Sequence, residues 1–82
     1  MDYVIEITLP AEGLTQDFTV PGSMQIGMLA QLSAQAFSGL TDGQYLPSAQ
    51  PILCTRRSGR ILDPNSVIQQ TEIRNGTKLM LI

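Results

Sequence analysis

The chain has 82 residues, with seven acidic and five basic side chains, no histidine and a net charge of −2 at neutral pH. This length predicts one domain spanning residues 1–82, because two smaller cores would not offset the chain entropy lost on folding. The negative charge argues against nucleic acid as the main partner. No apolar run reaches the ~20 residues of a membrane span, and the N-terminus lacks a secretory signal pattern. We therefore expect a cytoplasmic protein without direct membrane insertion.

The N-terminal segment predicts two strands. Residues 3–9 alternate between apolar and polar positions, which is the period of a half-buried strand. The side chains expected to face inward are Tyr3, Ile5, Ile7 and Leu9. After a turn that contains proline and glycine, residues 15–20 alternate again, with Phe18 and Val20 facing inward. Two alternating segments joined by a short connection predict an antiparallel hairpin.

The next segment has the period of an amphipathic helix of about four turns. Its apolar positions, spaced by three and four, are Ile26, Leu29, Ala30, Ala36, Phe37 and Leu40, with either Leu32 or Ser33. Ser23 is the predicted N-cap, because its hydroxyl can accept a hydrogen bond from a free amide of the first turn. Gly39 is the predicted left-handed residue that ends the helix. Gly27 costs about 1 kcal/mol relative to alanine, which indicates close packing against the sheet.

The second half of the chain predicts short strands joined by turns, after a polar loop at residues 40–50 that we assign to no element. The expected segments are a strand at 51–55, a turn at 57–59, a strand at 60–62, a turn at 63–66 that opens one helical turn through 67–68, and a terminal strand at 77–82. Asn75-Gly76 is a strong turn signal before the terminal strand. Leu79 and Leu81 are expected to face inward.

The predicted order is strand, strand, helix and three further strands. The single helix must lie across one face of the sheet to bury its apolar stripe. The first and last strands then sit side by side in the centre of the sheet and run parallel. This arrangement predicts an α+β fold of the β-grasp type, with one long helix across one face of a mixed sheet of four to five strands.

Two segments of the chain resemble known proteins. Residues 58–63 and 73–81 resemble the second half of ubiquitin-like domains, and residues 71–79 are similar to the ending of the small bacterial YukD/EsaB proteins. Glu72 stands where that family often has glycine, and Thr77 where it often has aspartate. The resemblance implies a ubiquitin-like fold and a cytosolic accessory component of a Gram-positive type VII secretion system. It also implies binding to membrane or ATPase subunits of that system, without catalysis.

The C-terminal residues separate this chain from protein modifiers. Ubiquitin and the sulfur carriers of this fold end in a flexible Gly-Gly tail, whereas this sequence ends at Leu81 and Ile82. Conjugation and sulfur transfer are therefore not expected. The alternative function is a small accessory subunit of a multicomponent enzyme such as an oxygenase. A domain cut from a larger membrane protein is a further alternative, which Met1 directly before the first strand disfavours.

An arginine-rich turn is the first candidate for protein binding. Arg56, Arg57 and Arg60 flank the turn between the third and fourth predicted strands. They are expected to form either a cationic edge for an acidic partner segment or an ordinary solvated turn. No glycine-rich loop opening a helix accompanies them, so a nucleotide site is not expected.

The outward face of the predicted sheet is the second candidate. If Leu79 and Leu81 face inward, Met80 and Ile82 face outward. The expected neighbours are Thr8 on the first strand and Leu53 on the third. Glu6 and Lys78 are also expected to pair across the two parallel strands. The resulting apolar patch predicts an interface with a partner or a homodimer, or else consists of scattered surface residues.

The chain offers little for catalysis or metal binding. Without histidine it lacks the commonest general acid or base and the commonest metal ligand. The single cysteine, Cys54, cannot form an internal disulfide and is expected to be a small core residue rather than a nucleophile. We therefore expect no catalytic residue, no metal and no cofactor.

Overall fold

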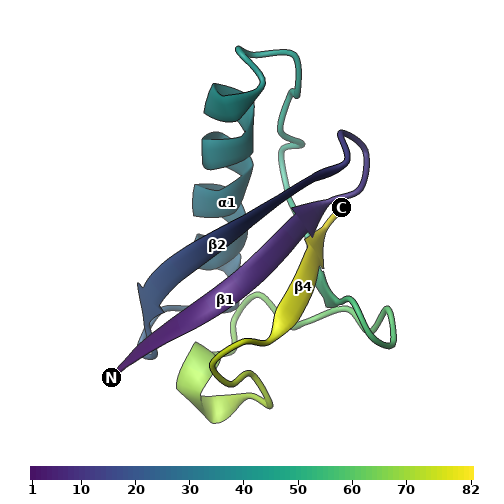
Figure 1. Cartoon of the computed structure of the whole chain (residues 1–82). Helices are drawn as coiled ribbons and strands as arrows, with labels where there is room; N and C mark the ends of the chain where they lie inside the picture. The colour runs from purple at the N-terminus through teal and green to yellow at the C-terminus, as the bar shows by residue number, and fades with distance from the viewer.

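The computed structural model describes all residues from 1 to 82 and forms a four-stranded mixed sheet covered on one face by a single long helix (Figure 1). Its elements are β1 (Asp2–Leu9), β2 (Leu14–Pro21), α1 (Ile26–Leu40), β3 (Leu53–Thr55), the 3-10 helix η1 (Ile68–Gln70) and β4 (Lys78–Leu81). The strand order is β2-β1-β4-β3, with β1 and β4 parallel and both outer pairs antiparallel. The predicted ubiquitin-like β-grasp arrangement is confirmed.

The core lies between α1 and the inner face of the sheet. The alternation predicted for the first and last strands is confirmed, since Tyr3, Ile5, Ile7 and Leu9 are buried together with Leu79 and Leu81. On α1 the buried residues are Ile26, Leu29, Ala30, Ser33, Ala34 and Phe37. Ser33 therefore takes the inward position rather than Leu32, and its hydroxyl donates to the Ala30 carbonyl at 3.0 Å. Leu40, predicted to be inward, is exposed.

Both predicted ends of the helix are wrong. The helix begins at Ile26, and Ser23 is exposed and does not cap it. Instead, the amide of Ile26 donates to the Ser66 carbonyl, and the amide of Gly27 donates to the Pro64 carbonyl, each at 2.9 Å. A neighbouring loop thus supplies the acceptors that a serine hydroxyl would have supplied. Gly27 accordingly lies close to Pro64 in this loop rather than to the sheet.

The C-terminal end of α1 lies one residue beyond the predicted glycine. The helix continues through Leu40, and the left-handed residues that follow are Asp42 (φ 54°) and Gly43 (φ 80°) rather than Gly39. The Gly43 amide donates to the Ser38 carbonyl at 2.8 Å, so the reversal after the helix is still hydrogen-bonded. No helix of the structure has the length and apolar character needed to cross a membrane.

The strand predicted at residues 60–62 is reduced to one isolated bridge between Cys54 and Ile61. The Thr55 amide donates to the Arg60 carbonyl and the Leu62 amide to the Leu53 carbonyl, both at 2.9 Å, and no longer ladder forms. The predicted helical turn is present, shifted to Ile68–Gln70. The turn at Asn75-Gly76 is also present, with Gly76 at φ 84°.

Candidate protein-binding surface

The face of the sheet that α1 does not cover is organised in rows by the strand register. Thr8 on β1 pairs with Met80 on β4, and Met80 pairs with Cys54 on β3. Thr8 also contacts Thr15 on β2, with 3.0 Å between their hydroxyl oxygens. Ile61 continues the row beyond Cys54 through the isolated bridge. Directly paired residues point to the same face, so these side chains share the outer surface.

Leu53 does not belong to this surface, which corrects its prediction as a binding residue. It is 1% exposed and lies in the core, directly opposite Leu81, which also faces α1. The outward residue on β3 is therefore Cys54. The sequence pattern missed this because β3 has only three residues, of which Leu53 and Cys54 are both buried. Alternation of polarity is absent where both faces of a strand are covered.

Four residues form an apolar patch on the outer face, named here the outer-face patch: Ile52, Ile61, Met80 and Ile82. Ile52 and Ile82 exchange two backbone hydrogen bonds of 3.1 and 2.9 Å, so their side chains lie next to each other. Their exposed fractions are 40% and 58%, and that of Ile61 is 61%. Met80 and Ile82 were predicted here. Ile52 and Ile61 were missed because neither lies in a regular strand.

The outer-face patch continues around the edge of β3 into an apolar groove. This groove has a volume of 410 Å³ and lies between β3 and the first half of α1. Ile52 and Ile61 line it together with Ile26, Ala30, Leu53 and Leu62. The apolar surface at this edge is therefore larger than the outer face alone.

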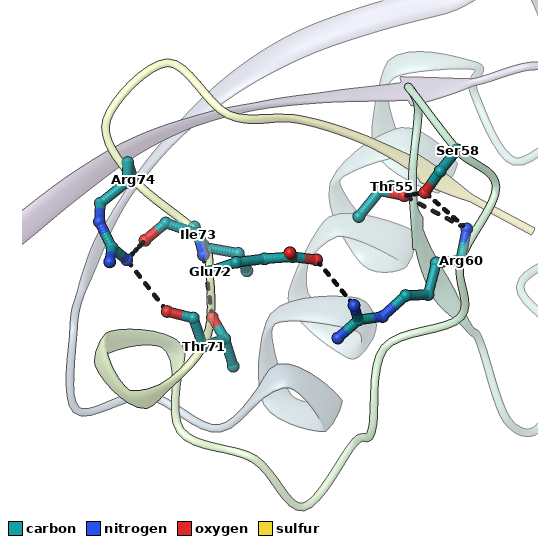
Figure 2. Close-up of polar contacts among 7 residues, drawn as sticks. All are labelled: Thr55, Ser58, Arg60, Thr71, Glu72, Ile73 and Arg74. Atoms are coloured by element: carbon teal, nitrogen blue, oxygen red, sulfur yellow. Dashed lines mark hydrogen bonds and ion pairs between the residues drawn. The ribbon is translucent and has the colours of Figure 1, made fainter.

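The arginines of the predicted cationic edge have different environments. Arg56 binds Glu6 through a 3.0 Å ion pair on the outer face, and Arg60 faces Glu72 at 3.7 Å (Figure 2). Arg57 and Lys78 form no ion pair. The predicted register of Glu6 with Lys78 is confirmed, but the Glu6 carboxylate binds Arg56 instead. The exposed pairs contribute little stability, and the unpaired cations remain free to bind a partner.

Cys54 is 2% exposed and lies on the outer face in the row between Met80 and Ile61. Burial raises the pKa of its thiol, because the thiolate would lose its hydration. A raised pKa disfavours the nucleophilic thiolate at neutral pH, so Cys54 serves as a packing residue beneath the outer-face patch. No three Cys, Asp or Glu side chains gather in a geometry that would hold a metal ion.

Comparison with known proteins identifies the fold. No protein-family model and no curated protein sequence matches the chain. Among solved structures, the chain is similar to the EccD5 ubiquitin-like domain from Mycobacterium xenopi, with a TM-score of 0.81, 16% identity and coverage of 100% of this chain and 93% of that one. It is also similar to a chain of an ESX-5 inner membrane complex, with a TM-score of 0.78 and 11% identity, covering 99% of this chain but 20% of that one.

A third similar structure comes from a different class of assembly. One chain of a toluene 4-monooxygenase HD complex with the inhibitor 4-bromobenzoate has a TM-score of 0.81 and 11% identity, covering 99% of this chain and 96% of that one. At these identities the likeness demonstrates a shared ubiquitin-like fold. The function has to be argued from the surface.

Proposed function

We propose that this chain is a non-catalytic protein-binding module of a type VII secretion system, of the YukD/EsaB kind found in Gram-positive bacteria. It binds membrane or ATPase subunits of that system in the cytoplasm. The observation that carries the proposal is the outer-face patch, an exposed apolar surface bordered on β4 by Lys78, which forms no ion pair. Exposed apolar patches with a polar rim are typical of protein interfaces.

The partner chemistry follows from this surface. Ile52, Ile61 and Ile82 require an apolar anchor, and methionine at position 80 suits an adaptable contact because its side chain is flexible and polarisable. The neighbouring Lys78 favours a partner with an acidic side chain beside that anchor. The likeness to the EccD5 ubiquitin-like domain and to a chain of the ESX-5 inner membrane complex, a type VII system, supports a secretion subunit as the partner.

The test is a binding measurement with purified components. The chain is titrated against the cytosolic parts of the type VII membrane and ATPase subunits encoded in the genome that carries it. We expect Met80→Glu to weaken binding at least about tenfold, because a carboxylate would be desolvated against an apolar anchor. Met28→Glu is the matched control, since Met28 is 51% exposed on α1, away from the outer face. Its affinity should stay at the wild-type value.

Three outcomes oppose the proposal. Absence of binding to every secretion subunit removes the functional assignment, and equal binding by Met80→Glu removes the outer-face patch as the interface. A concentration-dependent dimer that Met80→Glu dissociates would instead assign the same face to a homodimer. Size-exclusion chromatography with light scattering on the isolated chain distinguishes that case, because it requires no partner.

A second candidate is an accessory subunit of a multicomponent oxygenase. The observation that favours it is the match in length and fold to a chain of the toluene 4-monooxygenase complex, of which this chain covers 96%. The discriminating experiment is co-purification of the tagged chain at its native level from its own organism. Retention of oxygenase subunits, rather than secretion subunits, would support this alternative.

A further inference from the structure

A polar hollow lies at the end of the sheet where β3 ends and β4 begins. It is formed where the turn after β3 faces the segment that leads into β4, and Figure 2 shows these two segments facing each other, bridged by the Arg60–Glu72 ion pair. We name this feature the basic hollow. Its volume is 390 Å³, and its lining contains no apolar residue: Thr55, Arg57, Ser58, Glu72, Thr77 and Lys78.

The basic hollow offers more hydrogen-bond donors than the chain itself uses. Thr77 accepts the Arg74 amide at 2.8 Å, so its own hydroxyl hydrogen remains available. Thr55 and Ser58 have 2.6 Å between their oxygens, and one of their two hydroxyl hydrogens remains available after that contact. Arg57 and Lys78 add two cations without an ion pair. This set of donors is complementary to an anionic oxygen acceptor.

From this geometry we propose that the basic hollow binds the side-chain carboxylate of an acidic protein segment, and that this segment belongs to the partner of the outer-face patch. The identity of the segment therefore rests on the proposed function. Glu72 is the reason for choosing a carboxylate. It lines the hollow as an acceptor, and a phosphate group, whose oxygens point in all directions, would place at least one of them toward it.

Part of the nearby backbone is already hydrogen-bonded, since the amide of Arg74 donates to the Thr77 hydroxyl and the amide of Arg60 donates to the Thr55 hydroxyl at 3.2 Å. A planar carboxylate has both oxygens on one side, so it can bind the cations while facing away from Glu72.

The position of Lys78 connects the basic hollow with the outer-face patch. Lys78 and Met80 are two residues apart on β4, so their side chains leave the same face about 7 Å from each other. An extended partner segment with an acidic residue two positions from a large apolar residue would therefore contact both. All five basic residues of the chain lie between positions 56 and 78, which would orient such a segment toward this end of the molecule.

The test uses the full chain and short synthetic probes, followed by the amide NMR signals of Arg57, Thr77 and Lys78. The probes are a peptide with one aspartate two positions before a leucine, the same peptide with asparagine in place of aspartate, and inorganic phosphate. We expect saturable shifts with the aspartate peptide and at least about tenfold weaker binding of the asparagine peptide, since hydrogen bonds to charged groups are the stronger ones. Phosphate at equal concentration should leave the peptide bound.

Matched variants separate charge from folding. Arg57→Gln and Lys78→Gln should each weaken binding of the aspartate peptide at least about tenfold. Arg57→Lys should retain most of the affinity because it keeps the positive charge. Arg74→Gln is the control, because Arg74 lies at the same end without lining the hollow; its guanidinium donates to the carbonyls of Thr71 and Ile73. A dispersed amide spectrum for each variant verifies the fold.

The contrary results are equally specific. Equal binding of the aspartate and asparagine peptides, or no binding of either, would overturn the proposal, and displacement by equimolar phosphate would reassign the hollow to phosphate. None of these probes contains a secretion subunit, so the two proposals fail separately. If the peptide does not bind, the proposed role of the hollow is refuted, whereas Met80-dependent binding of a secretion subunit is unaffected. If the peptide binds but no secretion subunit does, the hollow is supported as a carboxylate site and the proposed function is refuted.

Discussion

At the scale of single residues, Cys54 is buried on a sheet face that no helix covers. Its neighbours in register, Met80 and Ile61, flank the small thiol on both sides and account for that burial. Because the thiolate would lose its hydration there, the pKa of Cys54 is raised, while in the unfolded chain it is about 8.5. The difference links the stability of the fold to alkaline pH.

We expect the free energy of unfolding to fall as pH rises above about 8.5. The thiol of the unfolded chain then loses its proton while the thiol of the folded chain keeps it. The stabilisation that the buried, protonated thiol gives is fully present below the pKa of the unfolded chain, and it is lost as pH rises through the pKa of the folded chain. The slope reaches at most about 1.4 kcal/mol per pH unit for one group. Urea unfolding at several pH values from 7 to 10, under reducing conditions, measures it.

Cys54→Ala is the control for this dependence. Its stability should be lower at neutral pH, because the thiol's packing is lost, but flatter between pH 8 and 10. Tyr45 also has a pKa raised by burial and contributes a decline common to both proteins. Parallel pH profiles for wild type and variant would contradict the assignment of the alkaline decline to Cys54.

At the scale of elements, the two glycines of α1 have opposite surroundings. A Cβ on Gly27 would lie 3.1 Å from the Pro64 carbonyl oxygen and 3.2 Å from its Cβ, whereas a Cβ on Gly39 would meet nothing within 4 Å. Gly27 also donates its amide to that same Pro64 carbonyl. Replacing each glycine by alanine therefore compares two effects on stability: the gain in helix propensity at both positions, and the cost of a steric clash with Pro64 at position 27 alone.

We expect Gly39→Ala to raise the free energy of unfolding by about 0.5–1 kcal/mol, because alanine is the better helix former and restricts the unfolded chain. Gly27→Ala should gain the same propensity but lose about 1–3 kcal/mol as the loop at Pro64 shifts away. Urea unfolding curves of the two variants beside wild type test this. Equal stabilisation by both would show that the loop yields without cost.

The same elements explain what was predictable from sequence. In β1 and β4 every second residue is a large apolar one that faces the core, so Ile5, Ile7 and Leu79 were assigned correctly. The start of α1 and the face of β3 depend on partners distant in the chain. A loop carbonyl caps the helix in place of Ser23, and pairing with Leu81 turns Leu53 inward. No local pattern contains such contacts, and for the same reason Ile52 and Ile61 were missed.

At the scale of the whole molecule, the centre of the sheet joins the two ends of the chain. Strand β4 lies between β1 and β3, and its Leu79 is fully buried opposite Ile7 on β1. Removing side-chain contacts there affects the pairing on both sides of β4. Ile82, one residue beyond the end of β4, is largely exposed and belongs to the outer-face patch.

These positions should separate stability from binding. Leu79→Ala should cost about 2–5 kcal/mol through lost burial and the cavity left behind. That is a large part of the roughly 4–12 kcal/mol expected for a domain of this length. Ile82→Ala, which removes similar hydrocarbon, should cost less than about 1 kcal/mol because little of it is buried. Urea unfolding gives both values, and titration with the partner should show a loss of affinity for Ile82→Ala at nearly unchanged stability. A comparable loss of stability in the two variants would mean that Ile82 belongs to the core, and the outer-face patch would then lose its most exposed strand-end anchor.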